Sequence, residues 1–155
     1  MNKDTVILRD VLNECTKHQK RMAYAYDRIE PLLPFSKDNV TQLSDEDVSH
    51  LDQYIFRFSK LQDAIGRKLF KAVLHWQGEN TDGQSLRDIF SRLEQLGIVE
   101  DYDAWNELRI IRNDSSHEYG KTPQILSEKL NKLFESRTGL ENYLEDIKTF
   151  VKQKK

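Results

Sequence analysis

Apolar residues recur at alternating steps of four and three in the first part of the chain, a pattern typical of a helix that buries one face. The pattern predicts a long helix from about Asp4 to Glu30, which Pro31 and Pro34 should end because proline cannot continue a helix. The apolar cluster within 32–35 should then fold back on the helices. The buried face of this first helix consists of Leu8, Leu12, Cys15, Met22, Tyr26 and Ile29.

The same spacing returns in the next part of the chain. Ser44-x-x-Asp47 resembles a capping box with aspartate in place of the usual glutamate, so a second helix should start there and run to about Trp76. Because a period of about 3.5 residues persists over this length, we expect the first two helices to pack closely and antiparallel. The apolar row of the second helix consists of Leu51, Ile55, Phe58, Ile65, Leu69, Ala72 and Trp76.

Two glutamines and one glycine interrupt these apolar rows. Gln19 and Gln62 occupy steps that apolar residues fill elsewhere, so they either pair and fix the register of the two helices or each border the core. Gly66 costs about 1 kcal/mol relative to alanine inside a helix. A close helix crossing at Gly66 would explain this cost.

Two shorter helices are expected next. Ser85-x-x-Asp88 should begin the third, and Gly97 fits its C-terminal cap. Either Asp101 or Asp103 should cap the fourth, whose apolar positions are Trp105, Leu108 and Ile111.

A last long helix is expected from about Pro123 to Lys152. Thr122 followed by Pro123 is a typical N-cap with proline in the first turn. Arg137 falls in the apolar row of this helix, where it should reach a carboxylate or extend toward solvent, and Gly139 is a candidate kink.

Composition limits the class of protein. A chain of 155 residues with 37% hydrophobic and 32% charged residues is typical of one folded domain, so we expect residues 1–155 to form a single all-α bundle of five helices. The single cysteine, Cys15, excludes an intramolecular disulfide and indicates a reducing compartment. No apolar run approaches the ~20 residues that span a membrane, and residues 1–4 lack a signal-peptide pattern. These features predict a cytoplasmic protein without membrane association.

The formal net charge of −2 argues against a general nucleic-acid binder, although it permits a local positive site. The basic end, with Lys148, Lys152, Lys154 and Lys155, is more typical of a solvated terminus than of an RNA-binding arm. The sequence has no zinc or EF-hand spacing and no glycine-rich phosphate loop. We therefore expect neither a metal nor a cofactor.

The densest group of reactive side chains is the stretch from Arg112 to Tyr119, at the end of the fourth helix. The guanidinium of Arg112 matches the geometry of a phosphate, and His117 can move a proton near neutral pH. Together they could bind a phosphodiester and transfer the protons that RNA cleavage requires. Ribose supplies its own nucleophile, so no metal is needed. The alternative is that these side chains form a helix cap or a solvated surface.

The spacing of this pair constrains any shared site. Residues five apart lie about 140° apart around an ideal helix, so Arg112 and His117 cannot share one face of an unbroken helix. Asp114, Ser115 and Ser116 are poor residues for a helix interior. We therefore expect the helix to loosen near Ser116, and we also expect the pair to work with its copy in a symmetric homodimer.

The motif resembles that of a known family. Arg112-Asn113-x-x-x-His117 is similar to the Arg-x(4–6)-His signature of HEPN domains, and the extension to Tyr119 is similar to the form found in HepT toxins. The segment from Phe56 to Gly66 also resembles the second helix of such proteins. The resemblance implies a five-helix HEPN-type bundle that forms a homodimer with paired motifs at a shared cleft.

The resemblance also implies a function. HEPN domains of this kind are metal-independent ribonucleases, and HepT toxins are paired with MntA-type nucleotidyltransferase antitoxins. In such a toxin–antitoxin system, type II or regulated by AMPylation, Arg112, Asn113 and His117 would cleave tRNA or mRNA, and Tyr119 would receive AMP. The alternative function is a non-catalytic HEPN subunit that binds a minimal nucleotidyltransferase.

Overall fold

The computed structural model describes residues 2–115 and 122–154, and over these residues every regular element is a helix. The expected all-α class is therefore confirmed for this part of the chain. None of the described helices is both long and apolar enough to cross a membrane. The α-helices are α1 (Lys3–Ile29), α2 (Asp45–Ala64), α3 (Phe70–Trp76), α4 (Leu86–Gln95), α5 (Tyr102–Ser115), α6 (Pro123–Glu135) and α7 (Arg137–Gln153).

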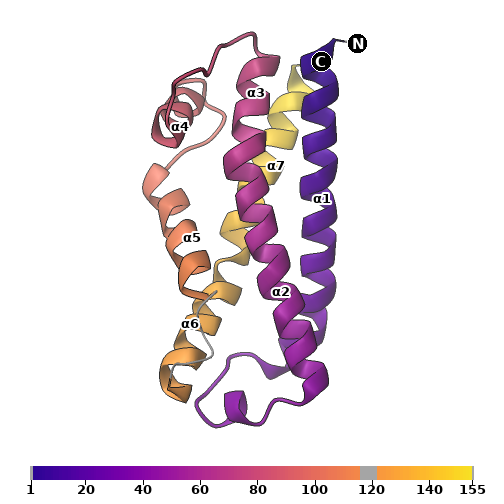
Figure 1. Cartoon of the computed structure of the whole chain (residues 1–155), viewed down its shortest axis with the longest axis vertical. Helices are drawn as coiled ribbons and strands as arrows, with labels where there is room; N and C mark the ends of the chain where they lie inside the picture. The colour runs from indigo at the N-terminus through magenta and orange to yellow at the C-terminus, as the bar shows by residue number, and fades with distance from the viewer. Residues whose placement is uncertain (1, 116–121, 155) are drawn as a thin grey trace.

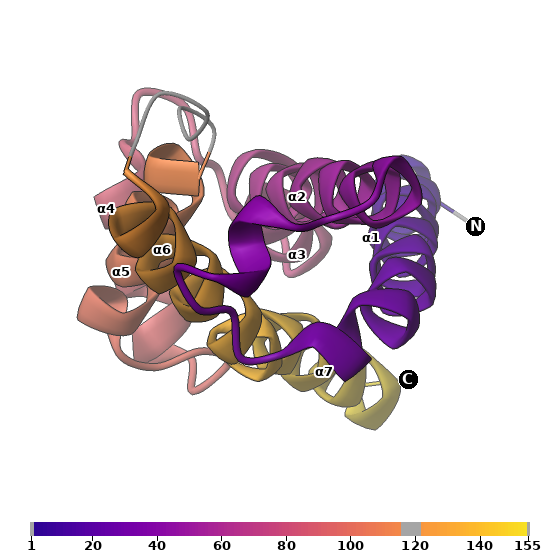
Figure 2. The ribbon, with the colours of Figure 1, turned by 90° about the horizontal axis from the view of Figure 1, so that it is seen from below.

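Three long rods form one side of the molecule, and the shorter helices form the other. α1 runs down the long axis, α2 and α3 return beside it, and α7 lies behind them (Figures 1 and 2). α4, α5 and α6 follow one another along the opposite side (Figure 1). The expected antiparallel packing of the first two helices is confirmed, and their apolar rows meet in the core.

The second expected helix is continuous from α2 to α3, but it contains one wider turn. Ser44 caps it as expected, because its hydroxyl accepts a hydrogen bond from Asp47 N at 3.0 Å and its own N–H donates to Asp47 Oδ2 at 3.2 Å. Residues Ile65–Leu69 form a π-helical turn, in which Phe70 N–H donates to the carbonyl of Ile65 five residues back. The rod thus runs from Asp45 to Trp76 with a local change of register.

Gly66 lies in this π turn, under the indole of Trp105 from α5. A Cβ atom built on Gly66 would lie 3.0 Å from Cζ2 of Trp105, closer than ordinary van der Waals contact. Trp105 is fully buried, and Phe70 and Tyr143 meet it edge-on with ring centroids 5.0 and 5.1 Å away. The close crossing expected at Gly66 is therefore confirmed, with α5 as the crossing helix.

The two glutamines do not pair. The Gln19 amide donates to Glu141 Oε2 at 2.7 Å, so it joins α1 to α7, whereas Gln62 is 3% exposed and lies on α2. Arg137 donates from Nε to Glu141 Oε1 at 2.8 Å and stacks over the ring of Tyr26. The carboxylate expected for Arg137 is thus Glu141, and the pairing suggested for the glutamines is wrong.

The last expected helix is two helices. α6 ends at Glu135 and α7 begins at Arg137, so the interruption is at Ser136, three residues before the expected kink at Gly139. The Ser136 hydroxyl donates to the carbonyl of Leu133 at 2.9 Å, a local bond by which serine competes with regular helix geometry. Nothing lies within 4 Å of a Cβ added at Gly139, so no close packing accounts for that glycine.

The remaining caps hold as expected. Asp101, rather than Asp103, caps α5, because its carboxylate accepts from Ala104 N at 3.0 Å. Ser85 and Asp88 form the capping box of α4, and Thr122 caps α6. These caps fix where α4, α5 and α6 begin.

The contact between Gly66 and Trp105 predicts a specific loss of stability. Gly66→Ala should lower the free energy of unfolding by about 1–2 kcal/mol, because overpacking against the indole should outweigh the gain in helix propensity. Gly139→Ala is the matched control and should raise stability by about 0.5–1 kcal/mol, since its Cβ meets no neighbour. Urea denaturation followed by circular dichroism measures both, and equal stabilisation by the two variants would contradict the close crossing.

Candidate functional site

Arg112 lies near the C-terminal end of α5, on the same face as Trp105. Positions 105, 109 and 112 are separated by four and three residues, which places their side chains on one side of a helix. Trp105 anchors this side against the π turn, so Arg109 and Arg112 face α2. The fold thus turns the arginine of the motif toward another helix rather than into bulk solvent.

The contacts of Arg112 include one carboxylate and its own neighbour in the motif. Its Nη1 lies 3.7 Å from Asp63 Oδ1, and its Nη2 donates to Asn113 Oδ1 at 3.1 Å. The side chain of Arg112 remains 31% exposed, so an anion can still reach the guanidinium. The structure therefore brings Arg112 and Asn113 together at one surface.

The other two residues of the motif lie outside the described part of the chain. His117 and Tyr119 fall within 116–121, as does the loosening expected at Ser116. The described part of α5 ends at Ser115. The roles expected of His117 and Tyr119 remain predictions from the sequence.

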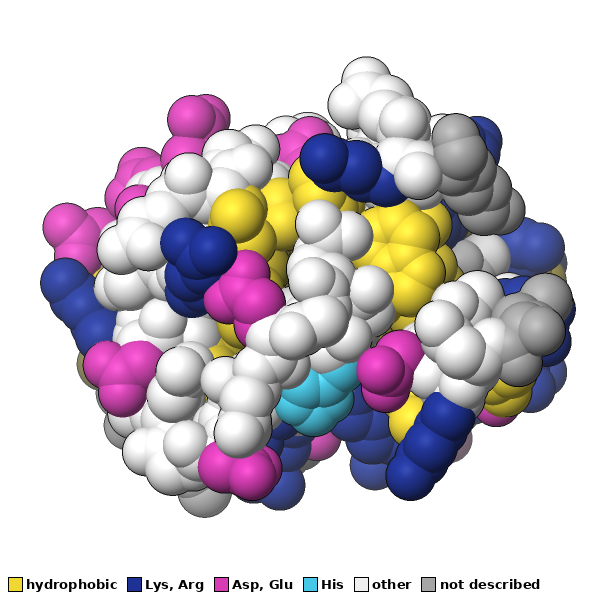
Figure 3. Space-filling view, turned by 90° about the horizontal axis from the view of Figure 1, so that it is seen from above, with side chains coloured by type: hydrophobic (Ala, Val, Ile, Leu, Met, Phe, Trp, Pro, Cys, Tyr) yellow, Lys and Arg dark blue, Asp and Glu magenta, His cyan; other side chains and the backbone are white. Residues whose placement is uncertain are grey.

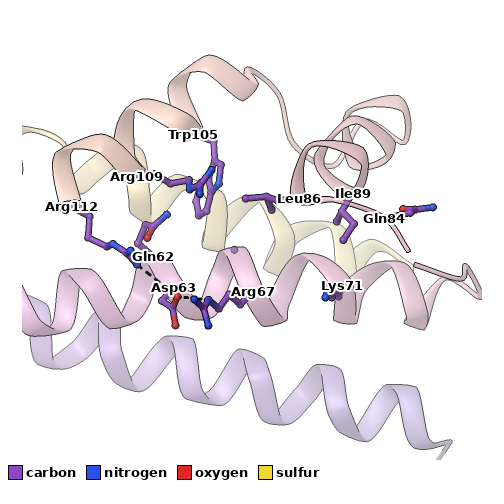
Figure 4. Close-up of a pocket in the computed structure, with 11 residues that line it drawn as sticks. Gln62, Asp63, Arg67, Lys71, Gln84, Leu86, Ile89, Trp105, Arg109 and Arg112 are labelled. Atoms are coloured by element: carbon purple, nitrogen blue, oxygen red, sulfur yellow. Dashed lines mark ion pairs between the residues drawn. The ribbon is translucent and has the colours of Figure 1, made fainter. Parts of the chain in front are cut away.

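A pocket of about 390 Å³ opens beside Arg112, between α5 and the rod formed by α2, the π turn and α3. Four cationic side chains line it, namely Arg67, Lys71, Arg109 and Arg112 (Figure 4). Asp63 is the one acidic residue among the described lining residues, so over these residues four positive charges less one negative charge leave an excess of three. The excess is local, because the whole chain carries a net charge of −2.

Asp63 holds two of these cations in place. Arg67 Nε lies 2.9 Å from Asp63 Oδ1, and Arg112 approaches the same oxygen from the other side (Figure 4). Oxygen atoms of a phosphate could join or replace Asp63 as partners of these guanidinium groups.

The inner wall of the pocket contains polar groups without partners. Gln62 is 3% exposed, and within residues 2–115 and 122–154 its amide makes no side-chain hydrogen bond. The indole Nε1 of Trp105 is buried without a partner in this part of the structure. The cost of about 1–3 kcal/mol for a buried unpaired polar group therefore applies to this indole, whereas the amide of Gln62 opens toward the pocket.

The end of the molecule seen in Figure 3 differs in its charge. Lysines, arginines and acidic residues alternate over that face around an apolar patch, so neither sign of charge gathers there. Charges of one sign lining a concave site raise the local potential more than scattered charges do. Of these two surfaces, the pocket beside Arg112 is the better anion site.

The three histidines of the described chain serve packing rather than this pocket. His18 Nδ1 accepts a hydrogen bond from Arg57 Nη1 at 3.0 Å, and burial is the main cause that lowers the pKa of His18. His75 Nε2 lies 2.8 Å from Thr81 Oγ1, and His50 pairs with Glu46 on its own helix. None of them lines the pocket. In the described residues, no three His, Cys, Asp or Glu side chains converge as metal ligands.

Sequence reasoning found Arg112 and Asn113 but missed most of the pocket. Arg109 had a usable signal, because it lies three residues before Arg112 and four after Trp105 on the same helical face. Arg67 and Lys71 lie in another helix, and only the tertiary fold brings them to α5.

Comparison with models of known protein families, with characterised proteins and with solved structures gives no match to this chain.

The arrangement around Asp63 predicts how the pocket responds to an added anion. Asp63→Asn should increase the affinity for inorganic phosphate about threefold to tenfold at low salt, because it removes one opposing charge beside two guanidinium groups. The stability of the variant should change by less than about 1 kcal/mol, since the ion pairs are partly exposed. Isothermal titration calorimetry measures the affinity.

The control for this measurement is Glu79→Gln, which removes a carboxylate from the ion pair with Arg92 outside the pocket. It should leave phosphate binding unchanged. An equal effect of the two variants would mean that net charge, rather than the pocket, governs binding.

Proposed function

We propose that this chain is a metal-independent ribonuclease of the HEPN type, acting as the toxin of a toxin–antitoxin pair. The observation that supports the proposal best is the position of Arg112 among Arg67, Lys71 and Arg109 at one pocket. The four cations and one carboxylate of its described lining suit the phosphates of an RNA strand. The HEPN-like motif from Arg112 to Tyr119 then assigns the chemistry to the same place.

The proposed reaction needs one base, one acid and a group that binds the phosphate. His117 removes the proton from the ribose 2′-hydroxyl, or returns a proton to the leaving 5′-oxygen. The 2′-oxygen forms a bond to phosphorus, the bond to the 5′-oxygen breaks, and a cyclic phosphate remains on the upstream ribose. Arg112 stabilises the charge on the phosphate oxygens, and Asn113 orients Arg112 through the hydrogen bond between them.

A symmetric homodimer would supply the second catalytic group. Arg112 and His117 are five residues apart, and an ideal helix would separate them by about 140°. Two motifs facing each other across a two-fold axis bring the arginine of one subunit near the histidine of the other without either helix bending. The expected dimer is thus part of the proposal.

Regulation would act through Tyr119. Transfer of AMP to the tyrosine hydroxyl by a nucleotidyltransferase antitoxin adds a phosphodiester and its negative charge. Placed beside the pocket of Arg112, this charge would compete with RNA for the same cations, as added phosphate does at other anion sites. The partner is therefore an MntA-type nucleotidyltransferase.

The net charge of −2 favours a second candidate, a non-catalytic subunit that docks a nucleotidyltransferase. In that case the cations of the pocket would contact the partner or its nucleotide. Such a subunit would form a stable complex with its partner and would leave RNA intact.

The catalytic proposal predicts selective losses of activity. His117→Ala should lower the rate of RNA cleavage about 10²- to 10⁴-fold and Arg112→Ala about 10²- to 10³-fold, with the circular dichroism melt unchanged. Cleavage of labelled tRNA and mRNA is measured with a chelator present, which should not reduce the rate. Arg92→Ala is the matched control, because Arg92 pairs with Glu79 outside the pocket. This variant should cleave RNA at the wild-type rate. Full activity of an Arg112→Ala/His117→Ala double variant would refute the assigned roles.

The regulatory proposal predicts a mass change. Intact-mass spectrometry after co-expression with the nucleotidyltransferase encoded beside this chain should show one or more added AMP units. Peptide mapping should place them on Tyr119, and Tyr119→Phe should remove both the mass gain and the protection of RNA. AMP on other residues only would contradict the role of Tyr119.

A further inference from the structure

We propose that the pocket beside Arg112 is a subsite for the RNA nucleotide next to the cleaved bond, in which Gln62 binds the edge of the base and Arg67 and Lys71 hold its phosphate. This inference rests on the proposed function for the identity of the ligand. It goes further by assigning base recognition to a residue outside the motif.

The pocket is longer than one phosphate contact requires. On the rod formed by α2, the π turn and α3, called the central rod below, the lining residues extend from Gln62 to Lys71. These positions are nine residues apart, about 13 Å at the rise of a helix. Arg112 and Asp63 lie at one end, and Lys71 and Gln84 lie at the other (Figure 4). Arg112 therefore engages one phosphate, while Lys71 is placed to meet the next unit of the strand.

Gln62 is the observation that points to a base rather than to phosphate alone. A glutamine amide offers a donor and an acceptor side by side, which matches the paired groups on the edge of a nucleobase. The side chain is buried and lines the pocket, and no described residue satisfies its amide. A site that binds only phosphate needs hydrogen-bond donors, and the amide oxygen of Gln62 is an acceptor.

The pocket also offers an apolar contact for the ring of the base. Of its three apolar lining residues, Leu86 is half-buried and can be reached, whereas Ile89 and Trp105 are buried beneath it. Apolar contact with the flat ring and polar contact with its edge are the usual combination in proteins that recognise single-stranded RNA. Cations, an amide and an apolar wall thus meet in one pocket of about 390 Å³.

Lys68 shows that the cations of the rod are divided between two sides. Its Nζ lies 2.9 Å from Glu14 Oε1, so Lys68 forms an ion pair with α1, whereas Arg67 and Lys71 line the pocket. Lys68→Ala therefore provides a matched control for Lys71→Ala within the same helical rod.

The test measures binding without cleavage. RNA oligonucleotides carrying a 2′-O-methyl group at the cleavage position cannot form the cyclic phosphate, so their affinity reports on the subsite even if catalysis is absent. A set that varies the base beside this position is titrated against the full chain by fluorescence anisotropy. The wild type should prefer one base at least about fivefold, the lower end of what one paired contact gives.

Gln62→Leu should abolish this preference while the circular dichroism melt stays within a few degrees of the wild type, because leucine is similar in size but offers neither a donor nor an acceptor to a base. Lys71→Ala should weaken binding to every oligonucleotide and flatten its salt dependence, whereas Lys68→Ala should change neither. Gln19→Leu is the control for the glutamine, since the Gln19 amide bonds Glu141 outside the pocket. It should lower stability and leave the base preference intact.

Four results would overturn the subsite. One is a wild-type protein that binds all bases equally, and another is a Gln62→Leu variant that keeps the preference. The third is inorganic phosphate binding as tightly as the oligonucleotides, which would leave an anion site only. The fourth is equal affinity for free nucleoside monophosphates, which would assign the pocket to a small nucleotide instead of an RNA strand. A protein that passes these tests but fails to cut unmodified RNA would instead refute the proposed catalysis.

Discussion

The contact between the indole of Trp105 and the backbone at Gly66 places α5 against the central rod. Without a Cβ at position 66, the ring approaches the rod within ordinary contact distance, and the ring faces of Phe70 and Tyr143 hold it there. Arg109 and Arg112 lie within about 60° of Trp105 around the axis of α5, so this contact also aims them at α2. One steric fit thus decides where the cations of α5 lie.

The π turn at Ile65–Leu69 determines the opposite wall. In an unbroken α-helix, Lys71 would lie about 140° from Gly66 around the axis. A π turn adds roughly one residue to the helix, which rotates the following residues back by about 100°. Lys71 then faces the same side as Gly66 and lines the pocket with it. The extra residue therefore turns Lys71 from the outer surface of the rod toward the pocket.

This register change explains what sequence reasoning could and could not reach. The repeat of apolar residues and the side-chain caps at Ser44, Ser85 and Thr122 are local signals, so the helices and where they begin could be predicted from them. The π turn leaves no comparable signal, because Ile65 and Leu69 fit the regular row with or without it. The interruption at Ser136 was also missed, since serine inside a helix bends it only in some contexts. Arg67 and Lys71 depend on the tertiary fold, and no spacing within one helix could have joined them to Arg112.

The local charge of the pocket also reconciles an acidic chain with the proposed RNA substrate. A protein with a net charge of −2 repels RNA weakly at distances beyond about 10 Å, where salt screens most of the interaction. Inside the pocket the excess of three positive charges over its described residues acts at short range, between low-dielectric walls formed by Trp105, Leu86 and Ile89. In the proposed function, a strand would therefore be held by a few phosphates at this place rather than along the whole surface. Such binding would favour the release of products after the proposed cleavage, and it would let a single added AMP compete for the few cations of the pocket.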